Sequence, residues 1–203
     1  MVGDTAVPVD AAALGQIFLD RRSVDNFLDR PVPDALLRRI YELARMPPTS
    51  SNSQPMRILF LKSPESRQRL APALSSGNRE KTLRAPVTGI VAHDLAFHTH
   101  LPRMFHTPGA ENWFKGNDTS IQVNSFRNGT LQAAYFLLAA RAVGLDIGPM
   151  SGFDNARVDA AFFSQGERAT WRSNFVCNLG YGDPAGLHPR DPRFEFDEVC
   201  HTI

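Results

Sequence analysis

The sequence predicts one α+β domain in which helix dominates. Three observations support this class. Several segments repeat apolar residues with the helical period, three short apolar runs fit strands, and no repeat, low-complexity run or linker divides the chain. With 203 residues the chain suits a single hydrophobic core, so we expect residues 1–203 to form one domain.

In the first half of the chain, capping residues, prolines and the spacing of apolar residues predict where the elements lie. Asp10 can cap a first helix that ends near residues 21–22. A second helix is expected over residues 33–46, because its apolar residues share one face and two prolines follow it. Residues 57–61 and 86–92 are predicted strands, and the Ser63–Pro64 pair between them opens a short helix.

The longest periodic segment covers residues 120–143, and Gly144 ends it. Its apolar residues cover more than one face, which predicts burial on several sides. Asp154 caps a further helix through Phe162, and residues 175–179 form a third strand. The segment 194–203 is a partly apolar tail whose packing partner the pattern does not identify. The apolar residues of the long helix are Ile121, Val123, Phe126, Leu131, Ala134, Leu137, Leu138 and Val143.

Charge and hydropathy exclude several classes of function. There are 22 Lys and Arg against 21 Asp and Glu, a formal charge of +1, so nothing favours nucleic acid or an anionic membrane as a partner. No apolar run approaches the length of a membrane span, and residues 1–13 lack the layout of a signal peptide. We therefore expect a cytoplasmic protein, in which Cys177 and Cys200 need not form a disulfide.

Two basic groups lie at opposite ends of the chain. Arg21, Arg22 and Ser23 follow the first helix, and two guanidiniums beside a hydroxyl can hold a phosphate, although arginines at a helix end also simply complement the helix dipole. His188, Arg190 and Arg193 follow a Gly-Tyr-Gly turn after the last strand. They could supply a second phosphate-binding group or form a solvated tail.

Two loops between these groups are rich in polar groups or glycine. Residues 49–54 place six hydroxyl or amide side chains in succession, which offers a flat heteroaromatic ligand more donors and acceptors than a turn requires. Residues 148–154 flank a rigid centre with two glycines, which let backbone N–H groups approach a ligand, although the same residues can be an ordinary loop before an Asp cap. The candidate ligand-binding residues are Ser51, Asn52, Gln54, Pro149, Met150, Ser151 and Gly152.

The order of the four clusters resembles the nitroreductase superfamily of FMN-dependent oxidoreductases, over about residues 18–193. The segments 73–86 (ALSSGNREKTLRAP) and 126–154 (FRNGTLQAAYFLLAARAVGLDIGPMSGFD) are similar to the subgroup that contains the malonic semialdehyde reductase of pyrimidine degradation. The resemblance implies a nitroreductase-like fold: a small mixed β-sheet flanked by helices, with a long central helix at the interface of a homodimer. It also implies FMN sites built from both chains.

The resemblance also assigns roles to the clusters. Arg21, Arg22 and Ser23 would meet the FMN phosphate and ribityl chain, with Arg190 and, as further candidates, His188 or Arg193. Asn52, with Ser51 and Gln54, would face the isoalloxazine ring from the other subunit. Met150, Ser151 and Gly152, after Pro149, would lie against the ring and direct a backbone N–H at flavin N5.

The implied activity is ping-pong hydride transfer from NADPH or NADH through FMN to a small-molecule acceptor, malonic semialdehyde, which becomes 3-hydroxypropionate. Arg127 is a candidate contact for its carboxylate, with the alternative of an arginine paired within the helix. The segment 106–114, with Trp113 and Phe114, is interpreted as a loop that covers the flavin. The alternatives are a broad-specificity nitroreductase or quinone reductase, and a flavin-binding protein without turnover.

Two positions depart from the family pattern. Asp25 stands where many members carry a basic residue near the pyrimidine edge of the flavin, and Arg57 is a candidate replacement for that charge. Ser151 stands where many members carry an acid.

A metal site at His98, His100 and His106 is disfavoured, because the spacing suits only an extended segment and no cysteine joins it. We expect no metal.

Overall fold

The computed structural model describes residues 7–203. Its centre is a four-stranded sheet in the order β1-β2-β4-β3, in which neighbouring strands pair antiparallel. The strands are β1 (Met56–Leu61), β2 (Val87–Asp94), β3 (Asp146–Met150) and β4 (Trp171–Gly180). The expected mixed sheet is therefore wrong for the four strands, and the one parallel contact at this sheet edge is an isolated bridge between Ser23 and Ile147. The α+β class is confirmed.

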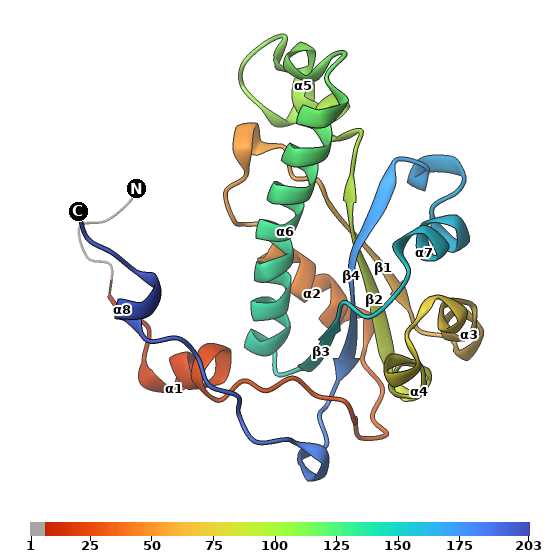
Figure 1. The fold of residues 1–203 in the computed structure, drawn as a ribbon, viewed down its shortest axis with the longest axis vertical. Helices are drawn as coiled ribbons and strands as arrows, with labels where there is room; N and C mark the ends of the chain where they lie inside the picture. The colour runs from red at the N-terminus through yellow and green to blue at the C-terminus, as the bar shows by residue number, and fades with distance from the viewer. Residues whose placement is uncertain (1–6) are drawn as a thin grey trace.

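Helices cover both faces of the sheet (Figure 1): α2 and α6 lie on one face, and α3, α4 and α7 lie on the other. None of the helices in the described residues is long and apolar enough to cross a membrane. The longer helices are α2 (Asp34–Ala44), α3 (Pro64–Leu70), α4 (Ser76–Arg84), α6 (Asp118–Ala142) and α7 (Asn155–Phe162). The short ones are α1 (Ala11–Leu14), η1 (Gly15–Leu19), η2 (Ser50–Asn52), η3 (Ala71–Ala73), η4 (Phe97–His100), α5 (Leu101–Met104), η5 (Ala110–Phe114), η6 (Gly166–Arg168), η7 (Pro184–Gly186) and α8 (Phe196–Val199).

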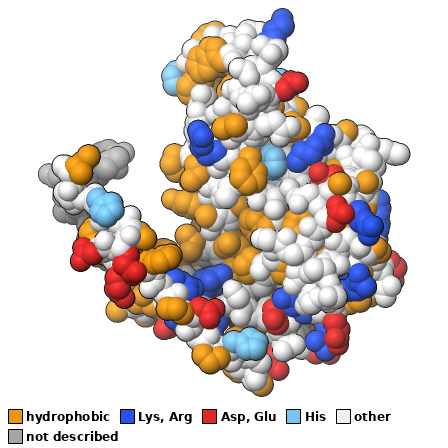
Figure 2. Space-filling model, viewed as in Figure 1, with side chains coloured by type: hydrophobic (Ala, Val, Ile, Leu, Met, Phe, Trp, Pro, Cys, Tyr) orange, Lys and Arg blue, Asp and Glu red, His pale blue; other side chains and the backbone are white. Residues whose placement is uncertain are grey.

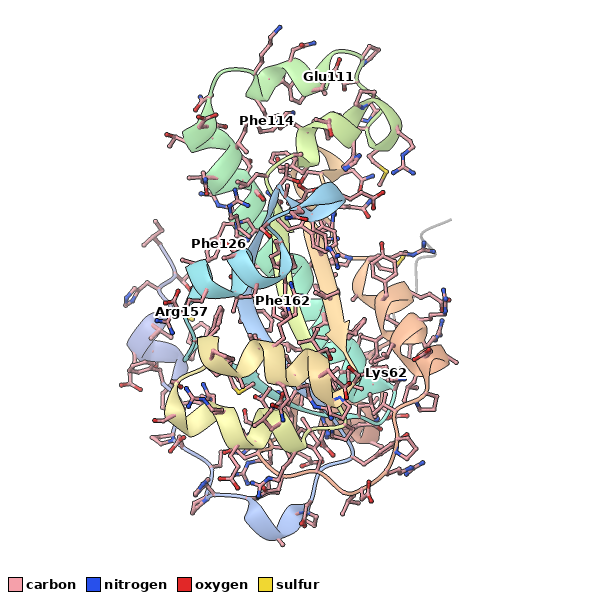
Figure 3. The ribbon with its side chains drawn as sticks, turned by 90° about the vertical axis from the view of Figure 1, so that its right-hand side faces the viewer. Lys62, Glu111, Phe114, Phe126, Arg157 and Phe162 are labelled. Carbon is pink, nitrogen blue, oxygen red and sulfur yellow. The ribbon has the colours of Figure 1, made fainter. Side chains whose placement is uncertain are left out.

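Two hydrophobic cores hold these layers together, and a small cluster stabilises a helical cap. The first core lies under α2 and α6 and is centred on Ile40 and Phe136. The second lies under α3 and α7 and includes Leu70 and Phe163. In the cap, η4, α5 and η5 enclose a cluster that contains Phe114. In Figure 3, Glu111 and Phe114 lie in this cap at one end of the molecule, far from Lys62.

The long helix packs differently from the sequence prediction. Its residues facing the sheet are mostly small or polar, while four of the apolar residues stand on the opposite face, with exposures of 44–53%. The prediction of burial on several sides holds where α6 packs on the sheet and on α2, and it is wrong for the outward face of the helix in the single chain. The buried residues are Ser125, Asn128, Gly129, Gln132, Ala133, Phe136, Ala139 and Ala140, and the exposed ones are Val123, Phe126, Leu131 and Tyr135.

Two further elements differ from expectation. Residues 146–150, which were expected to lead into a loop, form strand β3 at the edge of the sheet, where Pro149 is tolerated because an edge strand has one free side. Residues 76–84 form α4 despite few apolar residues, and of these only Thr82 is buried. The tail at 194–203 contains α8 and keeps Phe194, Phe196 and Val199 exposed.

Candidate functional site

The basic triplet is held against strand β3. Val24 N–H donates to the carbonyl oxygen of Ile147 at 3.0 Å, next to the Ser23–Ile147 bridge. The contact is so close that a Cβ added to Gly148 would lie 2.2 Å from the Val24 carbonyl oxygen. Only glycine fits this position without moving backbone. The first cluster and the glycine loop therefore lie side by side.

The arginines near the C-terminus reach the same place. Arg190 Nη2 donates to the carbonyl oxygens of Leu19 at 2.6 Å and Arg21 at 3.0 Å, and Arg22 donates to that of His188. Arg193 bonds only within its own segment, to the Asp191 and Pro192 carbonyls. A cavity of about 200 Å³ lies between the two segments. Its lining residues are Arg21, Arg22, Ser23, Asp25, Gly186, His188, Pro189, Arg190, Asp191 and Arg193.

This cavity is built to receive an anion. Burial, and next the neighbouring charges of Arg141, Arg193 and Arg190, lower the pKa of Arg21. Such a cluster of cations repels itself, and a bound phosphate would relieve the repulsion through charge-assisted hydrogen bonds. The donors present, four arginines and the Ser23 hydroxyl, therefore fit the phosphate of FMN.

Helix α4 adds two residues that the sequence analysis did not select. Asn78 Nδ2 donates to the carbonyl oxygen of Gly152 at 2.9 Å, and Lys81 Nζ lies 2.9 Å from Asp25 Oδ1. They are three residues apart and so share a face of the helix. The sequence did contain a signal for Asn78 and Lys81, since both belong to the segment 73–86 that resembles the subgroup.

Lys81 is a basic residue beside Asp25, which stands where many family members carry a basic residue. Arg57, the candidate for the missing basic residue, instead pairs with Asp94, with its Nη2 at 2.7 Å from Asp94 Oδ2. Within one chain Arg57 lies on β1 and does not line the basic cavity, and its role toward the flavin stays a prediction. The cation that the fold sets against Asp25 is Lys81.

The glycine loop offers backbone rather than side chains. The Met150 side chain is buried in the second core beside the Thr82 hydroxyl. Ser151 is exposed, and Pro149 is partly exposed. A Cβ on Gly152 would lie 2.7 Å from both Asn78 Nδ2 and Ser75 Oγ. The contact expected at residues 150–152 is therefore available only to main-chain groups and the Ser151 hydroxyl.

The polar loop at residues 49–54 has a strained backbone and lies away from the basic cavity. Ser51, Asn52 and Gln54 have φ angles of 52°, 48° and 41°, which cost free energy in non-glycine residues and occur most often at functional sites. Asn52 Nδ2 donates to the Met104 carbonyl oxygen at 2.7 Å, and Gln54 donates to Asn52 Oδ1 at 2.8 Å. None of the three lines the basic cavity.

Contacts along helix α6 show how far the polar loop lies from the basic triplet. Asn128 Oδ1 accepts from Ser50 N–H at the polar loop, and Gln16 Nε2 donates to the Arg141 carbonyl oxygen just before the triplet. Thirteen residues of helix separate Asn128 from Arg141, about 20 Å at the helical rise. One chain thus does not bring the polar loop to the basic cavity.

The three predicted substrate contacts, Phe114, Trp113 and Arg127, differ in how exposed they are. Phe114 is 7% exposed and packs on Phe97 at 4.9 Å between ring centroids, so in the single chain it belongs to the cap cluster, and its contact with substrate stays a prediction. Trp113 is 56% exposed. Arg127 is exposed on α6, which does not support the alternative of a pair within the helix. The segment 106–114 is not a simple loop, because η5 occupies its second half.

The histidines lie apart from one another. His98 stacks on Phe114, whereas His100 Nε2 lies 3.8 Å from Asp94 Oδ2. Within residues 7–203, no three His, Cys, Asp or Glu side chains come together as a metal site would require.

Replacing Gly148 by Ala should disturb both the sheet edge and the basic cavity. The new methyl group would meet the Val24 carbonyl, so residues 23–25 must move away from β3. We expect a lower melting temperature and a lower ratio of bound FMN to protein. Gly77→Ala is the matched control, because a Cβ there meets nothing within 4 Å. Equal flavin content in the two variants would contradict the close contact.

Comparison with known proteins gives a consistent result. The family model described as the nitroreductase family matches residues 19–181. A Burkholderia lata protein provisionally named NADH dehydrogenase/NAD(P)H nitroreductase is 57% identical over 189 residues, 93% of this chain and 95% of that protein. A similarly named protein of Stenotrophomonas maltophilia is 53% identical over 95% of this chain and 96% of its own.

Two solved structures share the fold. A Bacillus subtilis protein titled as a nitroreductase, ydfN, has a TM-score of 0.82 at 19% identity and covers 96% of this chain and 100% of its own. An Exiguobacterium sibiricum protein titled as a nitroreductase in complex with FMN has a TM-score of 0.80 at 20% identity, covering 98% and 100%. The matched family model and the close relatives agree with the fold, and the chain belongs to the nitroreductase family.

Proposed function

We propose that this protein is an FMN-dependent NAD(P)H oxidoreductase. The observation that carries the proposal is the basic cavity in which Arg21, Arg22 and Ser23 meet Arg190 from the far end of the chain. The FMN in the Exiguobacterium structure and the NAD(P)H in the names of the relatives support it. The cytoplasmic location remains a prediction.

Each group of residues then has a task. Arg21, Arg22, Arg190 and the Ser23 hydroxyl would hold the phosphate. The backbone at residues 150–152 would lie along the ring, since Asn78 and Ser75 already fix the Gly152 carbonyl. Lys81 would place a positive charge near the ring, partly balanced by Asp25. When bound, FMN supplies reversible hydride transfer at its N5 atom.

Reduction by nicotinamide tests the proposal. Mixing the purified, flavin-loaded protein with NADPH or NADH without oxygen should bleach the flavin absorption within seconds. Comparing the two donors gives the preference between them. A flavin that stays oxidised with both would leave only the alternative of a passive flavin-binding protein.

The proposed acceptor is malonic semialdehyde, reduced to 3-hydroxypropionate. The support is the similarity of residues 73–86 and 126–154 to that subgroup; the former contains Asn78 and Lys81, and the latter contains the glycine loop. The exposed Arg127 remains a candidate contact for the carboxylate. The test is the ratio of kcat/KM for malonic semialdehyde to that for a nitroarene. If only nitro compounds or quinones turn over, the broad-specificity alternative holds.

We also propose a homodimer whose two sites use residues from both chains. Four apolar side chains of α6 stand exposed, and in Figure 2 apolar side chains line the hollow between the body and the projecting terminal segments. A two-fold axis across the middle of α6 would set the partner's polar loop near this chain's basic cavity, because the two groups lie toward opposite ends of α6. This arrangement would bring Asn52 and the triplet to one flavin.

Leu131→Lys should break this dimer. The residue is 51% exposed in the middle of α6, so the lysine is tolerated by a single chain but would bury a charge in the interface. We expect a monomer in sedimentation that has also lost FMN, because shared sites are linked to assembly. Leu28→Lys, at a residue 48% exposed outside α6, is the control. A monomer that keeps FMN would contradict the shared site.

A further inference from the structure

A second cavity lies between strand β1, helix α2 and helix α5. Its volume of about 520 Å³ is in the range of small-molecule sites. It shares no lining residue with the basic cavity at Arg21. Gln54 of the polar loop lines one side of it, but the hydride transfer proposed above assigns no ligand to its interior, so what it binds is a separate question.

Its polar wall carries net positive charge. Arg57 is fixed there, since its Nη1 donates to the Gln54 and Met56 carbonyls at 3.0 and 2.9 Å and its Nη2 pairs with the buried Asp94. The Arg57–Asp94 ion pair has no net charge, so it adds none to the cavity wall. His100 and Arg103 also line the cavity, and Arg103 pairs with no acid in the described part of the chain. The uncompensated charge favours an anion.

The remaining wall is flat and apolar. Tyr41, Phe60 and Trp171 come from α2, β1 and β4, and two methionine side chains join them. Phosphate alone would leave this wall uncovered. Aromatic rings pack well against such side chains, which bury large apolar areas.

We propose that this cavity binds a small aromatic carboxylate. The carboxylate pairs with Arg103, and the ring packs against Tyr41, Phe60 and Trp171. Asn52, in the strained loop, is bonded to the Met104 carbonyl at one side of this cavity, so the site lies directly behind that loop.

Tryptophan fluorescence can measure binding. The chain has two tryptophans, so Trp113→Phe leaves Trp171 in the cavity as the reporter. Benzoate, its neutral analogue benzyl alcohol and inorganic phosphate are titrated into the purified full-length protein at neutral pH, with calorimetry in parallel. We expect saturable benzoate binding, and binding at least about tenfold weaker for benzyl alcohol, which loses the charged hydrogen bond, and for phosphate, which loses the ring contacts.

Variants identify the contacts. Arg103→Gln should weaken benzoate binding about tenfold, whereas Arg39→Gln, on α2 outside the cavity, should bind like the parent. Arg103 is exposed, so its variant should fold normally, which circular dichroism checks.

Three results would overturn the proposal. Equal binding of benzoate and benzyl alcohol would show that the charge plays no part. Equal binding of phosphate and benzoate would leave a simple anion site without an aromatic subsite. Absence of both a fluorescence change and heat with benzoate would show that the cavity takes no such ligand.

Discussion

Charge reversal at Arg21, as Arg21→Glu, is expected to strip FMN from the purified protein. The change removes a cation from the basic cavity and adds a carboxylate that repels the phosphate. Where such a contact is shielded from water, the loss is roughly 2–5 kcal/mol, or a rise in Kd of about thirtyfold or more. The ratio of flavin to protein absorbance and an FMN titration measure the effect.

Arg190→Glu is the companion variant, and its effect should be as large. Arg190 also holds the Leu19 and Arg21 carbonyls, so its reversal loosens the triplet as well. Arg39→Glu, an exposed position whose native partner is Glu42, should keep normal flavin content. If both Arg21→Glu and Arg190→Glu retain wild-type stoichiometry, the phosphate assignment is wrong.

Arg57→Met should produce the largest loss of folding stability. It leaves Asp94, whose side chain is 5% exposed, as a buried carboxylate without its cation. Breaking a buried pair from one side costs about 3–5 kcal/mol, which for a chain of this size lowers the melting temperature by roughly 10 °C. Differential scanning calorimetry measures the change directly.

Two further variants separate this pair from general packing effects. Arg39→Met removes an exposed ion pair with Glu42, and its cost should lie below about 1 kcal/mol. The double variant Arg57→Met with Asp94→Leu removes both charges and should recover part of the lost stability. A double variant less stable than Arg57→Met alone would show that Asp94 acts mainly through Thr170 and Ala96, whose donors it also accepts.

The elements predicted from the sequence are those with strong local signals. Helix α2 has a one-sided apolar stripe and two prolines after it, and β2 contains the apolar, β-branched run predicted as a strand, so both lie where they were expected. Strand β3 contains Gly148 and Pro149, which disfavour strands, and it forms because β4 pairs with it. Helix α4 has almost no apolar period, so its place depends on contacts with Gly152 and Asp25.

The sequence by itself determined the family resemblance and the chemical character of the four clusters, because residue types and their order are local properties. Only the tertiary structure decided which clusters meet. Arg190 contacts Arg21 across 169 positions of chain, and Lys81 rather than Arg57 faces Asp25. It also decided that α6 turns Phe136 and mostly small or polar residues inward and leaves four large apolar side chains exposed. Such choices depend on strand pairing and close packing between distant segments, which local periodicity does not encode.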